Sequence, residues 1–107
     1  MNRRTRIKIC GLRDPEMVAA AVQAGADAVG FVFYPPSVRA IGVAQAAELV
    51  TALPPFVTPV GLFVNAAPAE IVAALRAMPG LLLQFHGDES PAECERWQRP
   101  YLRALAV

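Results

Sequence analysis

Apolar, β-branched and aromatic residues gather in five short segments of this chain, and longer segments with helical patterning separate them. Four of the five are almost entirely apolar, as the strands of a parallel sheet are when both of its faces are covered. The intervening segments predict helices, so the chain is expected to alternate β-α-β-α-β-α-β-α-β. The predicted strands are residues 6–10, 28–33, 58–64, 81–85 and 101–107.

Proline marks the start of three of the four predicted helices. Pro15, Pro68 and Pro91 each stand at a first helical position with a carboxylate in the first turn. Proline fits there because its missing N–H would be unpaired in any case, and the carboxylate complements the positive end of the helix dipole. Ser90 and Glu93 add a capping box before the last helix.

The predicted helix ends are marked by glycine and proline. Gly25 and Gly80 follow the first and third helices, where glycine is the usual left-handed cap. The second helix, residues 43–53, begins without a strong cap and ends before Pro54-Pro55. Two architectures accommodate this repeat: an open, doubly wound five-stranded sheet, and part of a (β/α)8 barrel, which as a whole needs roughly 200 to 250 residues. Length alone favours the open sheet.

The composition excludes several classes of protein. The 107 residues are 55% hydrophobic and carry a formal charge of +1, which predicts a single globular domain over 1–107 and no nucleic-acid or membrane-surface partner. Apolar runs of about five to seven residues are too short to span a membrane. The basic N-terminus lacks the apolar core of a signal peptide, so a cytoplasmic protein is expected.

The cysteines and the single histidine do not predict a disulfide or a metal site. Cys10 and Cys94 lie far apart in a sequence without a secretory signal, which favours reduced thiols. Their spacing relative to His86 does not suit zinc, and neither a P-loop nor a GxGxxG turn is present. Cys94 is expected to pack inside the fourth helix, and Asp88 and Glu89 to form its acidic lead-in.

Three side chains stand where reactive groups collect in βα proteins, at the ends of parallel strands. Cys10 precedes a glycine turn, where a thiol is either a base or nucleophile or a small core residue. Arg39 follows a proline-stiffened loop and either grips a carboxylate or phosphate or is solvated. His86 either transfers protons, stacks on a planar ligand or has a structural role.

Four motifs, taken in order, resemble phosphoribosylanthranilate isomerase of tryptophan biosynthesis. They are KICGL at 8–12, GADAVGFVFY at 25–34 with PSVR at 36–39, VGLFVN at 60–65 and LQFHGDE at 83–89. Together they cover nearly the whole chain with matching spacing. The family is a (β/α)8 barrel, so the resemblance implies the N-terminal half of such a barrel, with about four βα units and a fifth strand.

The resemblance implies a cofactor-free Amadori rearrangement of N-(5'-phosphoribosyl)anthranilate to the carboxyphenylamino-deoxyribulose phosphate. An acid opens the sugar by protonating its ring oxygen, and a base removes the C2 proton of the resulting iminium. Cys10 matches the family's general base, and Arg39 matches the arginine that holds the anthranilate carboxylate. His86 matches a histidine near the anthranilate, with Gln84 and Asn65 as pocket lining. The family's general acid and phosphate loops belong to the other half of the barrel, so the 107-residue chain alone is expected to be inactive.

Two departures from the family pattern and two other functions stay open. Arg13 stands where a small polar residue is common, and Ala40-Ile41 replace an aromatic residue, which leaves the shape of that loop undetermined. A non-enzymatic half-barrel would form a homodimer or aggregate through its open sheet edges. A flavodoxin-like domain would need acidic clusters or a phosphate loop at the strand ends, where this chain has a cysteine, an asparagine and a histidine.

Overall fold

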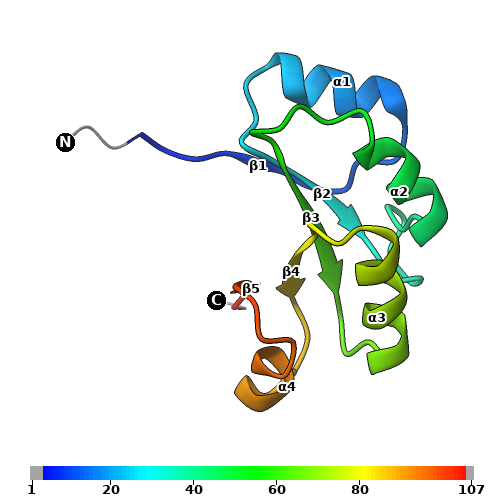
Figure 1. The fold of residues 1–107 in the computed structure, drawn as a ribbon, viewed down its shortest axis with the longest axis vertical. Coiled ribbons are helices and arrows are strands. Elements are labelled where there is room, and N and C mark those ends of the chain that lie inside the picture. The colour runs from blue at the N-terminus through cyan, green and yellow to red at the C-terminus, as the bar shows by residue number, and fades with distance from the viewer. Residues whose placement is uncertain (1–3, 106–107) are drawn as a thin grey trace.

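The computed structural model describes residues 4–105. It shows a curved parallel sheet with helices along its outer face (Figure 1). A helix connects each strand to the next, and every strand pair is parallel, as the alternating pattern predicts. The elements are β1 Lys8–Ile9, α1 Pro15–Gln23, β2 Ala28–Val32, α2 Val43–Val50, β3 Thr58–Phe63, α3 Pro68–Ala77, β4 Leu82–Phe85, α4 Pro91–Glu95 and β5 Tyr101–Arg103.

The strands lie side by side in the order in which they occur in the sequence, β1-β2-β3-β4-β5. A doubly wound sheet reverses its strand order at a switch point and carries helices on both faces, whereas a barrel wall keeps the sequence order and carries its helices outside. Figure 1 shows the second arrangement, with the inner face of the sheet open between β1 and β5. The doubly wound and flavodoxin-like alternatives are therefore wrong, although the chain length favoured them.

The hydrophobic core lies between the outer face of the sheet and the helices. Phe31, Phe63 and Phe85, from three neighbouring strands, are at most 1% exposed. Cys94 of α4 packs into the same core, which confirms its predicted packing role. The helices contribute Val18, Ala21, Ala46, Leu49, Ile71, Ala74 and Cys94 to this cluster. Burial of the three phenylalanines alone stabilises the fold by several kcal/mol, at about 2 to 3 kcal/mol for each side chain.

The inner face of the sheet is built from the alternate residues of each strand. The register places Val32, Leu62 and Gln84 beside one another across β2, β3 and β4. Val32 and Leu62 are buried, and so is Val60 one step below. In the part of the chain that the structure describes, the helices lie along the other face of the sheet (Figure 1), so these side chains are buried by their neighbours on the inner face. The inner face is thus apolar toward the middle of the strands and polar toward their carboxyl ends.

The predicted helix starts are confirmed. Asp14 caps α1 by accepting a hydrogen bond from the Met17 backbone N–H at 2.8 Å. Ser90 and Glu93 form the predicted capping box before α4. Gly42 precedes α2 without a side-chain cap, also as predicted. The helix ends after residue 50, and turns carry the chain from there to Pro54-Pro55.

One of the two predicted glycine caps is wrong. Gly25 ends α1 in the left-handed conformation, with φ of +95°. Gly80 does not adopt that conformation, because α3 has already ended at Met78, whose φ of −136° and ψ of 81° are not helical. The cause is Pro79: its ring disfavours the helical conformation of the residue before it.

The first and last strands are shorter than predicted. Pairing in β1 ends at Ile9, so Cys10 belongs to the turn that follows, and β5 ends at Arg103. Residues 106–107 of the predicted last strand lie outside the described residues. Among the described residues, no helix is long and apolar enough to cross a membrane.

Candidate active site

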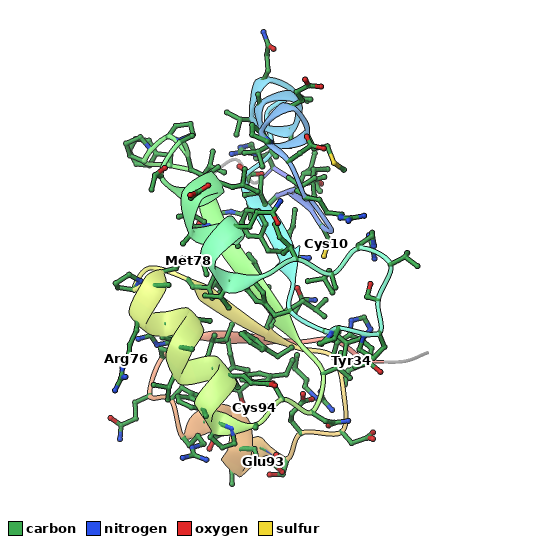
Figure 2. The ribbon with its side chains drawn as sticks, turned by 90° about the vertical axis from the view of Figure 1, so that its right-hand side faces the viewer. Cys10, Tyr34, Arg76, Met78, Glu93 and Cys94 are labelled. Atoms are coloured by element: carbon green, nitrogen blue, oxygen red, sulfur yellow. The ribbon has the colours of Figure 1, made fainter. Side chains whose placement is uncertain are left out.

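An open cavity of about 560 Å³ lies on the inner face of the sheet, at the carboxyl ends of the strands. Four of the five side chains that the sequence analysis proposed for the site line it: Cys10, Arg39, Gln84 and His86. Figure 2 shows Cys10 on the same side of the molecule as Tyr34, another lining residue. The volume is within the range of small-molecule sites in proteins, about 300 to 1,000 Å³.

Two glycines leave the space in which Cys10 and Arg39 lie. A Cβ atom on Gly30 would be 3.1 Å from the Cys10 sulfur, and one on Gly11 would be 2.6 Å from Cδ of Arg39. Gly11 has a φ of +83°, which residues with side chains rarely adopt. The Arg39 side chain therefore lies across the backbone of Gly11, where its Nη1 donates to the Cys10 carbonyl oxygen at 3.4 Å.

The loop that carries Arg39 is held by hydrogen bonds within it and by hydrogen bonds to Arg13 and β2. The Ser37 hydroxyl accepts a hydrogen bond from the Arg39 backbone N–H at 3.1 Å, and Arg13 Nη1 donates to the Val38 carbonyl oxygen at 3.1 Å. Ile41 is buried in the core, and its N–H donates to the backbone of β2. The two departures from the family pattern thus have structural roles: Arg13, in the segment before α1, supports this loop, and Ile41 anchors it.

Gln84 and His86 reach the cavity from β4 and from the turn after it. The Oε1 atom of Gln84 is buried and has no hydrogen-bond partner among the described residues. An unpaired buried carbonyl oxygen can accept an N–H or O–H group of a ligand. His86 is exposed at the rim, and its backbone N–H donates to the Phe63 carbonyl oxygen at 3.0 Å.

Asn65, the fifth predicted site residue, is not among the side chains that line the cavity. It adopts the left-handed conformation with φ of +49°, which asparagine tolerates better than most residues. Its Oδ1 accepts a hydrogen bond from the Asp88 backbone N–H at 2.8 Å, and a Cβ atom on Gly87 would lie 2.7 Å from it. Asn65 therefore joins the loop after β3 to the loop after β4.

Glu89 joins the loops at the same end of the sheet. The sequence pattern did not predict this role. It is buried, and its carboxylate accepts hydrogen bonds from the backbone N–H groups of Asn65 at 2.7 Å and Gly87 at 2.9 Å. Arg103 of β5 forms an ion pair with it at 2.9 Å. Burial would raise the pKa of Glu89, but these backbone hydrogen bonds and the Arg103 charge outweigh burial and lower it.

We expect Glu89→Gln to lower the free energy of unfolding by roughly 2 kcal/mol at pH 7. Breaking a fully buried pair costs about 3 to 5 kcal/mol, and the cost is smaller here because the Arg103 side chain is 31% exposed. Since folding lowers the pKa of Glu89, its contribution is complete above the unfolded value of about 4.5 and is lost as the pH falls below it. Urea unfolding at pH 7, 5 and 3 measures the difference between the two proteins.

Asp88→Asn is the matched control, because the neighbouring Asp88 is exposed. Its free energy of unfolding should stay within about 0.5 kcal/mol of the unsubstituted value at pH 7. A loss in Glu89→Gln that is equally large at pH 3 and pH 7 would show that the carboxylate's charge does not hold the loops.

A second cavity, of about 660 Å³, lies between α1 and α2. Its lining is mainly apolar and includes Pro15, Val18, Val22 and Leu49. It contains no cysteine, histidine or arginine, so it has none of the proposed site residues. Within residues 4–105, no three histidine, cysteine or acidic side chains are grouped so that they could hold a metal ion.

Six further residues line the first cavity and were not predicted for the site, and three of them are polar: Lys8, Tyr34 and Ser37. Strand alternation could have identified Lys8, because residues two apart on a strand point to the same face and Cys10 was already a candidate. Tyr34 follows β2 at the same edge of the sheet, where the rule about strand ends applies equally.

Comparison with known proteins agrees with the fold. Residues 7–106 match the family model described as PRAI, N-(5'phosphoribosyl)anthranilate (PRA) isomerase. The N-(5'-phosphoribosyl)anthranilate isomerase of Methylibium petroleiphilum is 68% identical over 104 residues, which are 97% of this chain and 49% of that protein. The chain therefore spans about half the length of the curated relatives it matches.

Two solved structures share the fold. A phosphoribosyl anthranilate isomerase in complex with reduced 1-(o-carboxyphenylamino)-1-deoxyribulose 5-phosphate is 40% identical, with a TM-score of 0.86 over 94% of this chain and 52% of its own. Monomers generated from the dimeric isomerase of Thermotoga maritima are 37% identical, with a TM-score of 0.83 over 94% of this chain and 51% of their own. The sheet and helices thus correspond to half of a (β/α)8 barrel, and with the family match over residues 7–106 the chain belongs to the N-(5'-phosphoribosyl)anthranilate isomerase family.

Proposed function

We propose that this chain supplies one half of the active site of an isomerase that acts on N-(5'-phosphoribosyl)anthranilate in tryptophan biosynthesis. The observation that carries the proposal is that Cys10, Arg39, Gln84 and His86 line one cavity at the carboxyl ends of the strands. These residues come from separate parts of the sequence, and the parallel order of the strands brings them to one edge of the sheet. The proposal includes no metal or cofactor, because the rearrangement needs only proton transfer.

Cys10 is the proposed general base. After the sugar ring has opened, the substrate is an iminium whose C2 proton is acidic, because the electron pair left behind can move toward the positive nitrogen. A thiolate beside C2 removes this proton, and a double bond forms between C1 and C2. Cys10 suits this role because its side chain is only partly buried and lines the cavity.

Arg39 is the proposed carboxylate ligand. Its guanidinium is held beside Cys10 by the contact with Gly11 and by the loop that Ser37 and Arg13 support. A planar guanidinium can donate two parallel hydrogen bonds to a carboxylate. The molecule bound in the related isomerase carries a carboxyphenyl group, and we assign the equivalent group of the substrate to Arg39, with His86 and Gln84 beside it.

A chimera tests the proposed function. Residues 1–107 replace the matching half of the Methylibium petroleiphilum isomerase, which restores a complete barrel from two closely similar sequences. We expect the purified chimera to convert N-(5'-phosphoribosyl)anthranilate, and residues 1–107 alone to be inactive. A folded chimera without turnover, measured beside the active relative, would contradict the proposal.

Arg39→Ala in this chimera is expected to raise KM at least about tenfold and to change kcat less. The reason is that a charge-assisted bidentate bond to the substrate carboxylate exists before and during the reaction, so its loss weakens binding throughout. Steady-state kinetics measure both constants. Arg99→Ala is the control, because Arg99 donates to the Pro79 carbonyl oxygen and does not line the cavity. A change confined to kcat would place Arg39 in the chemical step instead.

A further inference from the structure

Lys8 is the one lysine of the described cavity lining, and the proposed mechanism does not yet use it. The register pairs Lys8 with Ala28, which lies two residues before Gly30 on β2. The Lys8 side chain nevertheless extends toward the carboxyl ends of the strands, since a Cβ atom on Gly30 would lie 3.4 Å from Lys8 Nζ and 3.1 Å from Cys10 Sγ. The ammonium therefore lies at the level of the thiol and within about 6.5 Å of it, the sum of those two distances.

Among the described residues, the cavity lining offers this ammonium no acidic partner. The lining includes Lys8 and Arg39 but no aspartate or glutamate. The two ion pairs among residues 4–105 join Arg4 to Asp27 and Arg103 to Glu89. Within the part of the chain that the structure describes, the ammonium is thus available to donate a hydrogen bond to a ligand oxygen.

We propose that Lys8 is a further catalytic residue, whose ammonium donates a hydrogen bond to the oxygen on C2 of the substrate. This inference rests on the proposed function. The geometry fits, because an N–H···O bond measures about 2.9 Å, a C–O bond about 1.4 Å, and a reacting carbon lies about 3 to 3.5 Å from its base. These lengths allow a sulfur and a nitrogen within about 6.5 Å of each other to contact C2 and its oxygen at the same time.

The electron flow shows what the ammonium would do. When Cys10 takes the C2 proton, the C–H electron pair forms the C1–C2 double bond and the C1–N π pair moves onto nitrogen, which gives a neutral enolamine. The enolamine becomes the ketone when C1 gains a proton from the Cys10 thiol and the C2 hydroxyl loses its own proton to water. Negative charge develops on the C2 oxygen as that proton leaves, and Lys8 stabilises it.

The position of the ammonium can be tested in the 107-residue chain without any turnover. Iodoacetate and iodoacetamide alkylate the same thiolate, but only iodoacetate is an anion. The rate with iodoacetate divided by the rate with iodoacetamide therefore rises with the positive charge near the thiolate. We expect Lys8→Met to lower this ratio at Cys10 about threefold at low salt, the effect of a unit charge some 6 Å away in water, and 1 M salt to remove the difference. Mass spectrometry distinguishes a label on Cys10 from one on Cys94. Cys94 should react slowly, because it is buried and burial raises the pKa of its thiol.

Two variants control this experiment. Lys8→Arg keeps the charge and should keep the ratio near its unsubstituted value. Arg76→Met removes one positive charge from the exposed end of α3, on the opposite side of the molecule from Cys10 (Figure 2), and should leave the ratio unchanged. An unchanged ratio in Lys8→Met, or an equal fall in Arg76→Met, would overturn the placement of the ammonium.

The chimera tests the catalytic role. We expect Lys8→Met to lower kcat at least about tenfold with little change in KM, because the hydrogen bond strengthens as the charge develops, and Lys8→Arg to recover part of the loss. Circular dichroism confirms that each variant is folded. A kcat within twofold of the unsubstituted chimera would overturn the role of Lys8 while the proposed function stands. An inactive unsubstituted chimera would contradict both, and the alkylation ratio would then report the position of the ammonium alone.

Discussion

Replacing Cys10 with alanine is expected to lower kcat of the chimera at least about 10²-fold, with a smaller change in KM. A positioned general base contributes about 10² to 10⁴ to the rate, and alanine has no group that can accept the C2 proton. The binding contacts of Arg39 and Gln84 stay in place, so ground-state binding should change little. Single-turnover kinetics with saturating substrate separate the proton-transfer step from product release.

The other cysteine is the natural control for this experiment. Cys94→Ala removes a sulfur that is 1% exposed in the core of the same chain, so it should cost stability and leave kcat nearly unchanged. Cys10→Ser keeps the size of the side chain but offers a hydroxyl that is rarely ionised near neutral pH, so it should stay close to Cys10→Ala. A near-normal kcat in either Cys10 variant would remove Cys10 from the mechanism.

The parts of the fold that the sequence predicts well depend on local chemistry. Pro91 and the Ser90–Glu93 capping box fix the start of α4 through contacts within one turn. Near-continuous apolar strands predict a parallel sheet for a similar reason, since each strand carries its own pattern. Strand order is different, because it depends on how successive βα units curve around one another. Length favoured the open sheet, and only the resemblance to a barrel family pointed to the order that the structure shows.

Within the site, sequence position identified the residues on the inner face but not the contacts between loops. Cys10, Arg39 and His86 follow strands, and parallel strands end at one edge of a sheet. The role of Glu89 depends on Asn65 and Arg103, which lie 24 and 14 residues away. No local pattern predicts such a contact, so Glu89 was expected to be no more than an acidic helix lead-in. The resemblance placed Asn65 in the pocket lining, and the structure shows that its side chain joins two loops.

The apolar side chains of the sheet differ in their exposure. Val60 and Leu62, on the inner face, are buried. Exposed large apolar side chains lie at both edges of the sheet, and also at Met17, Val38 and Phe56 away from the edges. Ile7 and Ile9 lie at the β1 edge, and Leu102 and Leu105 at the β5 edge, all between 39% and 76% exposed. The edges differ from those other positions because they combine exposed apolar side chains with a free strand backbone.

The 107-residue polypeptide, expressed on its own, is expected to self-associate at micromolar concentration through these edges. β1 and β5 each pair on one side in the described sheet, and a strand with a free row of N–H and C=O groups pairs readily with another chain. We expect Leu102→Lys to shift the population toward monomer in sedimentation velocity, because a lysine on an edge strand opposes pairing. Leu102 is 41% exposed, so the substitution should not unfold the sheet.

Phe56→Lys is the contrasting variant, since it adds the same charge at a more exposed apolar side chain. Phe56 is 96% exposed in the loop between α2 and β3, away from either edge strand. If sheet edges drive association, Phe56→Lys should sediment like the unsubstituted chain, because its loop carries no free strand edge. A monomer produced by Phe56→Lys but not by Leu102→Lys would move the interface to that loop. A stable monomer without either substitution, one that binds no hydrophobic dye, would show that the edge residues are tolerated in water and that the chain does not associate.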